Sequence, residues 1–158
     1  MDYFFSTLIV TTILGASLVS GLLFAFSNFV MKALAELPPE TGMIAMQQIN
    51  EKIINPIFLI LFFGTPALCS IIVFNSILSI NQADSIFLLL GALAYLTGPF
   101  GITMMFNVPL NNLLASANGS KAKDIWSMYQ IKWQRWNHIR TYIGALSITF
   151  LSLGLSKV

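Results

Sequence analysis

The sequence predicts an all-α integral membrane protein, a four-helix transmembrane bundle with two amphipathic interfacial helices. Hydrophobic residues make up 56% of the 158 positions and charged residues only 9%, whereas charged residues are about a quarter of an ordinary soluble domain. Several apolar runs reach the roughly 20 helical residues that are needed to cross a hydrocarbon core. Basic residues are concentrated in two of the segments between these runs. The length indicates a single domain.

Four apolar runs are long enough to span, and they cover Tyr3–Met31, Pro56–Ile80, Ile86–Phe106 and Ile139–Leu155. Four crossings place the two long connecting segments on one side of the membrane and both termini on the other. The long segments carry Lys32, Lys52, Lys121, Lys123, Lys132 and Arg135, and the opposite side carries only Lys157. Because positive loops stay in the cytoplasm, we expect both termini outside, in a bacterial inner membrane.

The first run contains small residues at a four-residue spacing, namely Ser17, Gly21 and Ala25. This pattern allows membrane helices to approach closely and predicts a packed face. Asn28 falls within about 40° of that face at 100° per residue. Its amide needs a partner inside the bundle, either in an interhelical hydrogen bond or in a bound ligand.

Residues 40–54 have helical periodicity but are too short and too polar to span the membrane. Pro38 and Pro39 separate them from the first run, and Asn55-Pro56 separates them from the second. We expect a helix that lies in the membrane interface and covers the bundle. Its inner stripe would consist of Met43, Gln47, Asn50 and Ile54. Two amides in this stripe are unusual, because burying an unpaired amide costs about 2 kcal/mol or more.

The third run ends in an amide-rich segment around Pro109, which contains Asn107, Asn111 and Asn112. Because proline lacks a backbone donor and frees a carbonyl one turn earlier, we expect the helix to break here. The three amides can cap the freed backbone groups or line a pocket.

The second interfacial helix is expected from about Ala122, and it merges into the fourth run. At 100° per residue, one stripe of this segment holds Trp126, Tyr129, Trp133, Trp136 and Arg140, with Asn137 at its edge. His138 lies about 100° round from Asn137. The aromatic stripe can bind a flat oxygenated ring system, or it can anchor the helix at the lipid headgroups.

The residue types limit the chemistry. Cys69 is the single cysteine and His138 the single histidine, so no metal-ligand set is evident, and the net charge of +2 is too small to indicate nucleic-acid binding. What remains is a polar rim consisting of Asn28, Gln47, Asn50, Asn55, Asn107, Asn111, Asn137, His138 and Arg140, beside Trp133 and Trp136. Amides and arginine can hold a phenolate or enolate oxygen, and a neutral histidine can accept a proton.

Four segments of the chain resemble the motifs of the anthrone oxygenase-like membrane family (the DUF1772 group). They read FAFSNFVM at 24–31, AMQQIN at 45–50 with Asn55-Pro56, NVPLNN at 107–112, and WQRWNHIR at 133–140. The resemblance covers nearly the whole chain in order.

This resemblance implies a cofactor-free oxygenation of a polycyclic phenol, with no metal or flavin. A base removes the acidic benzylic proton, and the resulting anion reacts with oxygen directly. His138 would be the base, Asn137, Arg140 and Asn111 would hold the oxyanion, and Trp133 and Trp136 would stack on the rings. The remaining amides of the rim, from Asn28 to Asn107, would contact the substrate.

Two alternatives stay open. His138 lies off the aromatic stripe, so the amides and Arg140 could carry the catalysis by stabilising the anion alone. The chain could also be a non-catalytic membrane module that binds a lipid, a quinone or a partner subunit through the same rim. The expected partners are the lipid bilayer and a hydrophobic aromatic small molecule, and an oligomer is compatible with either reading.

Overall fold

The computed structural model describes residues 3–82 and 84–157, apart from the side chain of Ser120. Within these residues the chain is helical throughout, with short turns and no strand. The elements are α1 (Tyr3–Ala25), η1 (Phe26–Val30), α2 (Met31–Ala35), α3 (Pro39–Lys52), α4 (Pro56–Leu78), α5 (Ser85–Tyr95), η2 (Leu96–Asn107), α6 (Val108–Ala115), η3 (Gly119–Lys121) and α7 (Ala122–Leu155). Both η1 and η2 are π-helical, and they continue the helices before and after them.

Three continuous helical segments are long and apolar enough to cross a membrane, namely Tyr3–Ala35, Pro56–Leu78 and Ser85–Ala115. Each is longer than the roughly 20 residues that a hydrocarbon core requires. The chain is therefore an integral membrane protein. The apolar half of α7, which contains Arg140, is not among these three segments.

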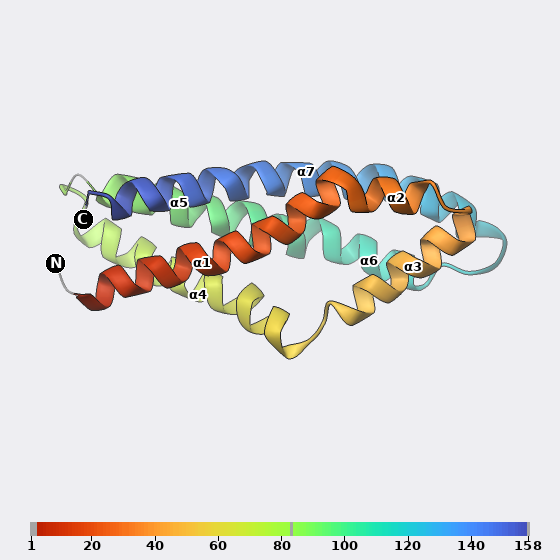
Figure 1. Ribbon diagram of the computed structural model, residues 1–158, viewed down its shortest axis with the longest axis horizontal. Coiled ribbons are helices and arrows are strands. Elements are labelled where there is room, and N and C mark those ends of the chain that lie inside the picture. The colour runs from red at the N-terminus through yellow and green to blue at the C-terminus, as the bar shows by residue number, and fades with distance from the viewer. Residues whose placement is uncertain (1–2, 83, 158) are drawn as a thin grey trace.

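The long helices pack side by side into one elongated body (Figure 1). Helix α7 lies along α1 and α5, and α4 contacts both of those helices as well. The start of α1 and the end of α7 are at the same end of the molecule (Figure 1). The shared core is apolar and includes Ile9, Ala16, Cys69, Ala92 and Leu151.

The packed face of α1 differs from the predicted one. Gly21 is exposed, and a Cβ at this position would meet nothing within 4 Å. The close approaches involve Gly15, where a Cβ would lie against Thr65, and Ser20, which lies against Gly144. Because the buried face is rotated away from Gly21, Asn28 is exposed. The prediction that Asn28 lies inside the bundle was wrong.

Prolines mark the starts of two helices. Pro39 begins α3 and Pro56 begins α4, as predicted. Pro109 does not break the chain, because it lies in the first turn of α6, where the missing N–H costs little. The helix predicted from about Ala122 merges into the fourth apolar run as expected, because the 34 residues of α7 run without interruption.

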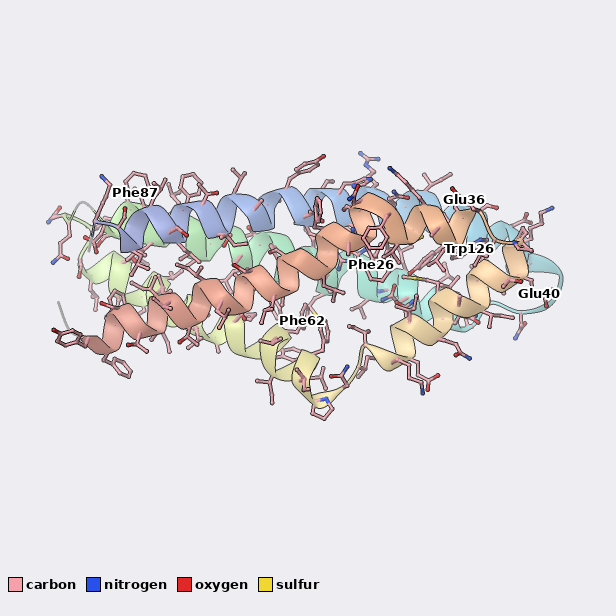
Figure 2. All side chains as sticks on the ribbon, in the orientation of Figure 1. Phe26, Glu36, Glu40, Phe62, Phe87 and Trp126 are labelled. Carbon is pink, nitrogen blue, oxygen red and sulfur yellow. The ribbon has the colours of Figure 1, made fainter. Side chains whose placement is uncertain are left out.

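A second cluster of buried side chains holds α3 against α2, α6 and the first half of α7. It contains Met31, Leu34, Met43, Met46, Leu114, Trp126, Tyr129 and Trp133. Figure 2 shows Trp126 beside α2, between Phe26 and the end that carries Glu36 and Glu40. Only 3% of Trp126 is exposed, so this indole is a core residue and the interpretation as a headgroup anchor does not hold for it.

Candidate functional site

A cavity of about 720 Å³ lies where α3 covers the ends of the long helices. The last turns of α1, the first turns of α4 and parts of η2, α6 and α7 complete its lining (Figure 1). Its volume is in the range of pockets that bury small organic ligands. Phe58, Phe62 and Phe63 of α4 form an aromatic wall, and Trp133 of α7 supplies another ring. Figure 2 shows Phe62 on the side of α4 that faces the other helices.

The lining includes a buried arginine. Arg140 is 5% exposed, and its guanidinium lies 5.0 Å from the centre of the Trp133 ring. Its Nε and Nη2 donate to Asn137 Oδ1 at 3.0 and 2.7 Å, and its Nη1 donates to Thr103 Oγ1 at 2.7 Å. One N–H on Nη1 and one on Nη2 remain without a partner in the described part of the chain. The cation is thus held by neutral groups and retains donors for a ligand.

Asn137 fixes the position of this guanidinium. Arginine can only donate, so the atom of Asn137 that faces Arg140 must be the oxygen. The Asn137 amide nitrogen then donates to the Leu23 carbonyl at 2.9 Å and to Ser27 Oγ at 2.8 Å. Asn137 is fully buried, and both the oxygen and the nitrogen of its side-chain amide have hydrogen-bond partners. It therefore positions Arg140 and has no group left for a substrate oxygen.

The two π-helical segments supply the hydroxyl partners of this pair. Ser27 lies in η1 and bonds to Asn137, while Thr103 lies in η2 and bonds to Arg140. Ser27 also lies 3.0 Å from Thr141 Oγ1 of α7. Single π-turns inside α-helices are frequent at functional sites. Both irregular segments of this chain converge on Asn137 and Arg140, and this convergence marks the region as the candidate site.

Asn111 is a second polar residue of the cavity lining. Its Oδ1 accepts from Tyr129 Oη and from Trp133 Nε1, both at 2.9 Å. An indole N–H is only a donor, which fixes the orientation of the amide. Burial raises the pKa of Tyr129 and outweighs the hydrogen bond from Asn50, which lowers it. Tyr129 is therefore a neutral donor, and the Asn111 Nδ2 group, which has no partner among the described residues, can face the cavity.

The two amides of α3 line the same cavity. Gln47 Nε2 donates to the Leu114 carbonyl at 2.7 Å, and Asn50 Nδ2 lies 3.4 Å from Tyr129 Oη. These contacts join α3 to α6 and α7, so both amides also hold the cover in place.

The structure does not bring every predicted residue into this cavity. His138 is half-buried on another side of α7, and Trp136 stacks on Phe106 at 3.8 Å between ring centres. Neither residue lines the cavity. His138 lies roughly 140° from Trp133 around α7, whereas Trp136 is near the stripe but its ring packs on Phe106. The structure thus gives no support to His138 as a base for a ligand in this cavity.

Three predicted amides are also elsewhere. Asn28 is exposed, and Asn55 caps α4 by accepting from the Phe58 N–H at 3.1 Å. Asn107 is buried behind the cavity, where its Nδ2 donates to the Trp133 carbonyl at 3.3 Å. Its Oδ1 has no partner among the described residues. Asn55 and Asn107 have structural contacts that account for their amides at least in part.

Comparison with protein families identifies the chain. A sequence model of the anthrone oxygenase family matches residues 58–150, which is more than half of the protein. The chain belongs to the anthrone oxygenase family. No curated protein and no solved structure matches it.

The part of this anthrone oxygenase family member that the match covers begins at Phe58. It includes the aromatic wall of α4, Thr103, Asn111, Trp133 and Arg140, and half of the residues that line the cavity. Helix α3, with Gln47 and Asn50, lies outside the matched residues. The residues that match the family model therefore form the side of the cavity that carries the α4 phenylalanines and Arg140. Helix α3, which covers the cavity, precedes the matched residues.

Sequence reasoning missed several residues of the site. Thr103 and Ser27 were not singled out because both lie in π-helical segments, where an α-helical count does not give the side-chain direction. The phenylalanines of α4 were not distinguishable within a uniformly apolar run. Tyr129 was placed on the aromatic stripe, but its hydrogen bond to Asn111 was not predicted.

Proposed function

We propose that this member of the anthrone oxygenase family oxidises a planar polycyclic phenol of the anthrone type without a cofactor. The observation that carries the proposal is a buried guanidinium held only by neutral side chains, beside a cavity with aromatic walls. In this proposal the apolar half of α7 is the fourth span of a transmembrane four-helix bundle, and α3 lies in the interface as a cover.

The proposed reaction consumes one dioxygen for each anthrone. Loss of a benzylic proton leaves an anion whose charge is shared with the carbonyl oxygen of the substrate. The anion gives its electrons to dioxygen, and a carbon–oxygen bond forms at the benzylic carbon to give a hydroperoxide after protonation. The second benzylic proton then leaves, the O–O bond breaks, and a new carbonyl and one water are formed.

Arg140 is the residue that we expect to touch the developing charge. Donors that are already oriented toward a developing oxyanion stabilise it strongly in a site with little water. A nearby positive charge also lowers the pKa of the substrate, because it favours the ionised form. Trp133 and the rings of α4 would hold the flat substrate by stacking. Asn111 would contribute its free amide N–H groups.

Among the described residues that line the cavity, the titratable groups are Arg140 and Glu51. Glu51 is on the outer surface, 74% exposed, and it pairs with Lys52 at 3.2 Å. We therefore propose that the substrate loses its proton to water or hydroxide, with Arg140 making this ionisation easier. The same lack of a buried base supports a second candidate function, a non-catalytic module that binds aromatic compounds.

The test is oxidation of anthrone by the purified protein in lipid nanodiscs, followed by oxygen uptake and by chromatography of the anthraquinone. We expect a rate above that of empty nanodiscs that does not change with chelators. Arg140→Lys should lower the rate by about 10², the scale for losing an oriented donor to an oxyanion.

His138→Ala should keep the rate, since His138 lies outside the cavity. Arg135→Gln is the matched control, because Arg135 is an exposed arginine of the same helix. A loss of activity in His138→Ala that leaves Arg140→Lys active would contradict these roles. Saturable binding of anthrone without any acceleration would favour the non-catalytic module.

A further inference from the structure

The positive charge of Arg140 has no counterion in the described part of the protein. The one ion pair found there joins Lys52 to Glu51 on the surface. Arg140 is buried and its partners are the uncharged side chains of Asn137 and Thr103. A buried charge without a partner of opposite sign is costly, so the arrangement is suited to a ligand that brings a negative charge of its own.

Beside Trp133, the polar groups of Arg140 and Asn111 that have no partner among the described residues are donors, whereas the free amide oxygens of Gln47 and Asn50 belong to the cover α3. Asn111 Oδ1 already accepts from Tyr129 and Trp133, and Asn137 Oδ1 already accepts from Arg140 twice. On Arg140 and Asn111, the groups that remain without a partner in the described part of the chain are two N–H groups of the guanidinium and the Nδ2 group of the amide. This set matches an oxygen that carries negative charge and offers little to a neutral hydroxyl group that must donate.

The exposed part of the cavity lining contains large apolar side chains beside the polar Gln48, Glu51 and Asn112. Ile54 is 68% exposed, Phe63 51%, Ile44 46% and Met104 42%, and all four line the cavity. Phe63 and Met104 belong to segments that are long and apolar enough to cross the membrane. The opening is thus adapted to a ligand that arrives dissolved in the bilayer, with its anionic group reaching inward to Arg140.

We propose that the cavity selects hydrophobic aromatic acids in their anionic form, including carboxylates that the oxygenase reaction cannot consume. Such compounds would bind with the rings between Trp133 and the phenylalanines of α4 and the carboxylate at Arg140. The inference rests on the same cavity as the proposed function, but it does not require turnover. It identifies a class of dead-end ligands and inhibitors.

The test compares two probes with the same three rings and different charge, 9-anthracenecarboxylate and 9-anthracenemethanol. Saturable quenching of tryptophan fluorescence is measured for the full protein in nanodiscs, with empty nanodiscs subtracted. We expect the carboxylate to bind at least about tenfold more tightly, the scale of one charge-assisted hydrogen-bond pair. Dodecanoate should compete at least about tenfold more weakly, because a flexible chain cannot stack on the rings.

Three variants test whether the preference for the carboxylate arises in this cavity. Arg140→Gln should remove it, and Arg135→Gln, on the exposed side of the same helix, should keep it. Asn111→Asp guards against a folding defect in the first variant. It keeps the oxygen that accepts from Tyr129 and Trp133 and replaces the free Nδ2 group by a second oxygen, so it should fold and still lose the carboxylate preference.

Equal affinity for the two probes, or a preference that survives in both Arg140→Gln and Asn111→Asp, would overturn the proposal. Dodecanoate that binds as tightly as the aromatic acid would overturn the assignment to flat rings. The proposed function is tested independently of this inference. Anthrone oxidation without a carboxylate preference would reject only the inference, and a carboxylate preference without anthrone oxidation would reject only the reaction.

Discussion

Asn137 and Arg140 lie about one turn apart on α7, and a single oxygen of Asn137 accepts from both Nε and Nη2 of Arg140. This contact sets the plane of the guanidinium before any ligand arrives. The other end of the same amide is tied to the Leu23 carbonyl and to Ser27 of η1. The orientation of the arginine is thus determined by the junction between α1 and α7.

Asn137→Ala should destabilise the protein. The substitution leaves the Leu23 carbonyl without its side-chain donor and removes the acceptor from two N–H groups of buried Arg140, and each unpaired buried group costs about 1–3 kcal/mol. Thermal unfolding in detergent measures the effect. Asn28→Ala removes an exposed amide from the same region and should change stability by about 0.5 kcal/mol or less. Equal losses in the two variants would contradict the role of Asn137.

Gly91→Ala should weaken the contact between α5 and α7. A Cβ at residue 91 would lie 2.8 Å from the backbone nitrogen of Leu151 and 3.0 Å from the carbonyl oxygen of Ser147. Backbone atoms cannot move aside easily, so we expect a loss of about 1–3 kcal/mol from overpacking. Gly21→Ala is the control, because that site is open, and it should be neutral or stabilising by up to about 1 kcal/mol. The reverse order would show that the Gly21 face is the packed one.

Tyr129 should make stability depend on pH in the alkaline range. Burial raises the pKa of this phenol in the folded protein, so its stabilising contribution is complete below about pH 10, the pKa of an exposed tyrosine. The contribution is lost as pH rises from there toward the folded pKa, because the unfolded chain releases the proton first. Melting temperatures from about pH 8 to pH 11 should fall less steeply for Tyr129→Phe than for the wild type. Parallel curves would show that another group causes the decline.

The membrane orientation can be read by cysteine labelling in intact bacterial cells. The basic residues of the long connecting segments predict that Asn118→Cys is protected from an impermeant maleimide, while Ser156→Cys is labelled. Native Cys69 is buried and should stay unreactive. Labelling at residue 118 together with protection at residue 156 would invert the topology.

Some of the helix boundaries could be predicted from the sequence. Pro39 and Pro56 begin helices, and the second apolar run predicted to Ile80 ends as a helix at Leu78. The aromatic stripe of α7 was also predictable, because polar residues on its other faces reveal the period. Trp126, Tyr129, Trp133 and Arg140 are all buried, as an α-helical count requires. Only half-buried Trp136 departs from this pattern.

The rotation of α1 could not be predicted. Its lipid-facing and core-facing residues are equally apolar, so periodicity carries little information about which face is buried, and the spacing of Ser17 and Gly21 was a misleading signal. The π-helical segments are a second limit. They change the angle between successive side chains, which is why Thr103 and Ser27 appear beside Arg140 and Asn137 without any signal in the sequence.

The uninterrupted length of α7 also has a consequence for membrane depth. At about 1.5 Å per residue, its 34 residues extend roughly 50 Å, which exceeds a hydrocarbon core of about 30 Å. In the proposed four-span arrangement, with Leu155 at one membrane surface, the Arg140 backbone would lie about 22 Å away, or roughly 8 Å below the opposite surface. A ligand must then place its charged oxygen below the lipid headgroups to reach Arg140. A thinner bilayer would bring Arg140 closer to water. Bilayer thickness should thereby set how strongly this arginine discriminates between charged and neutral ligands.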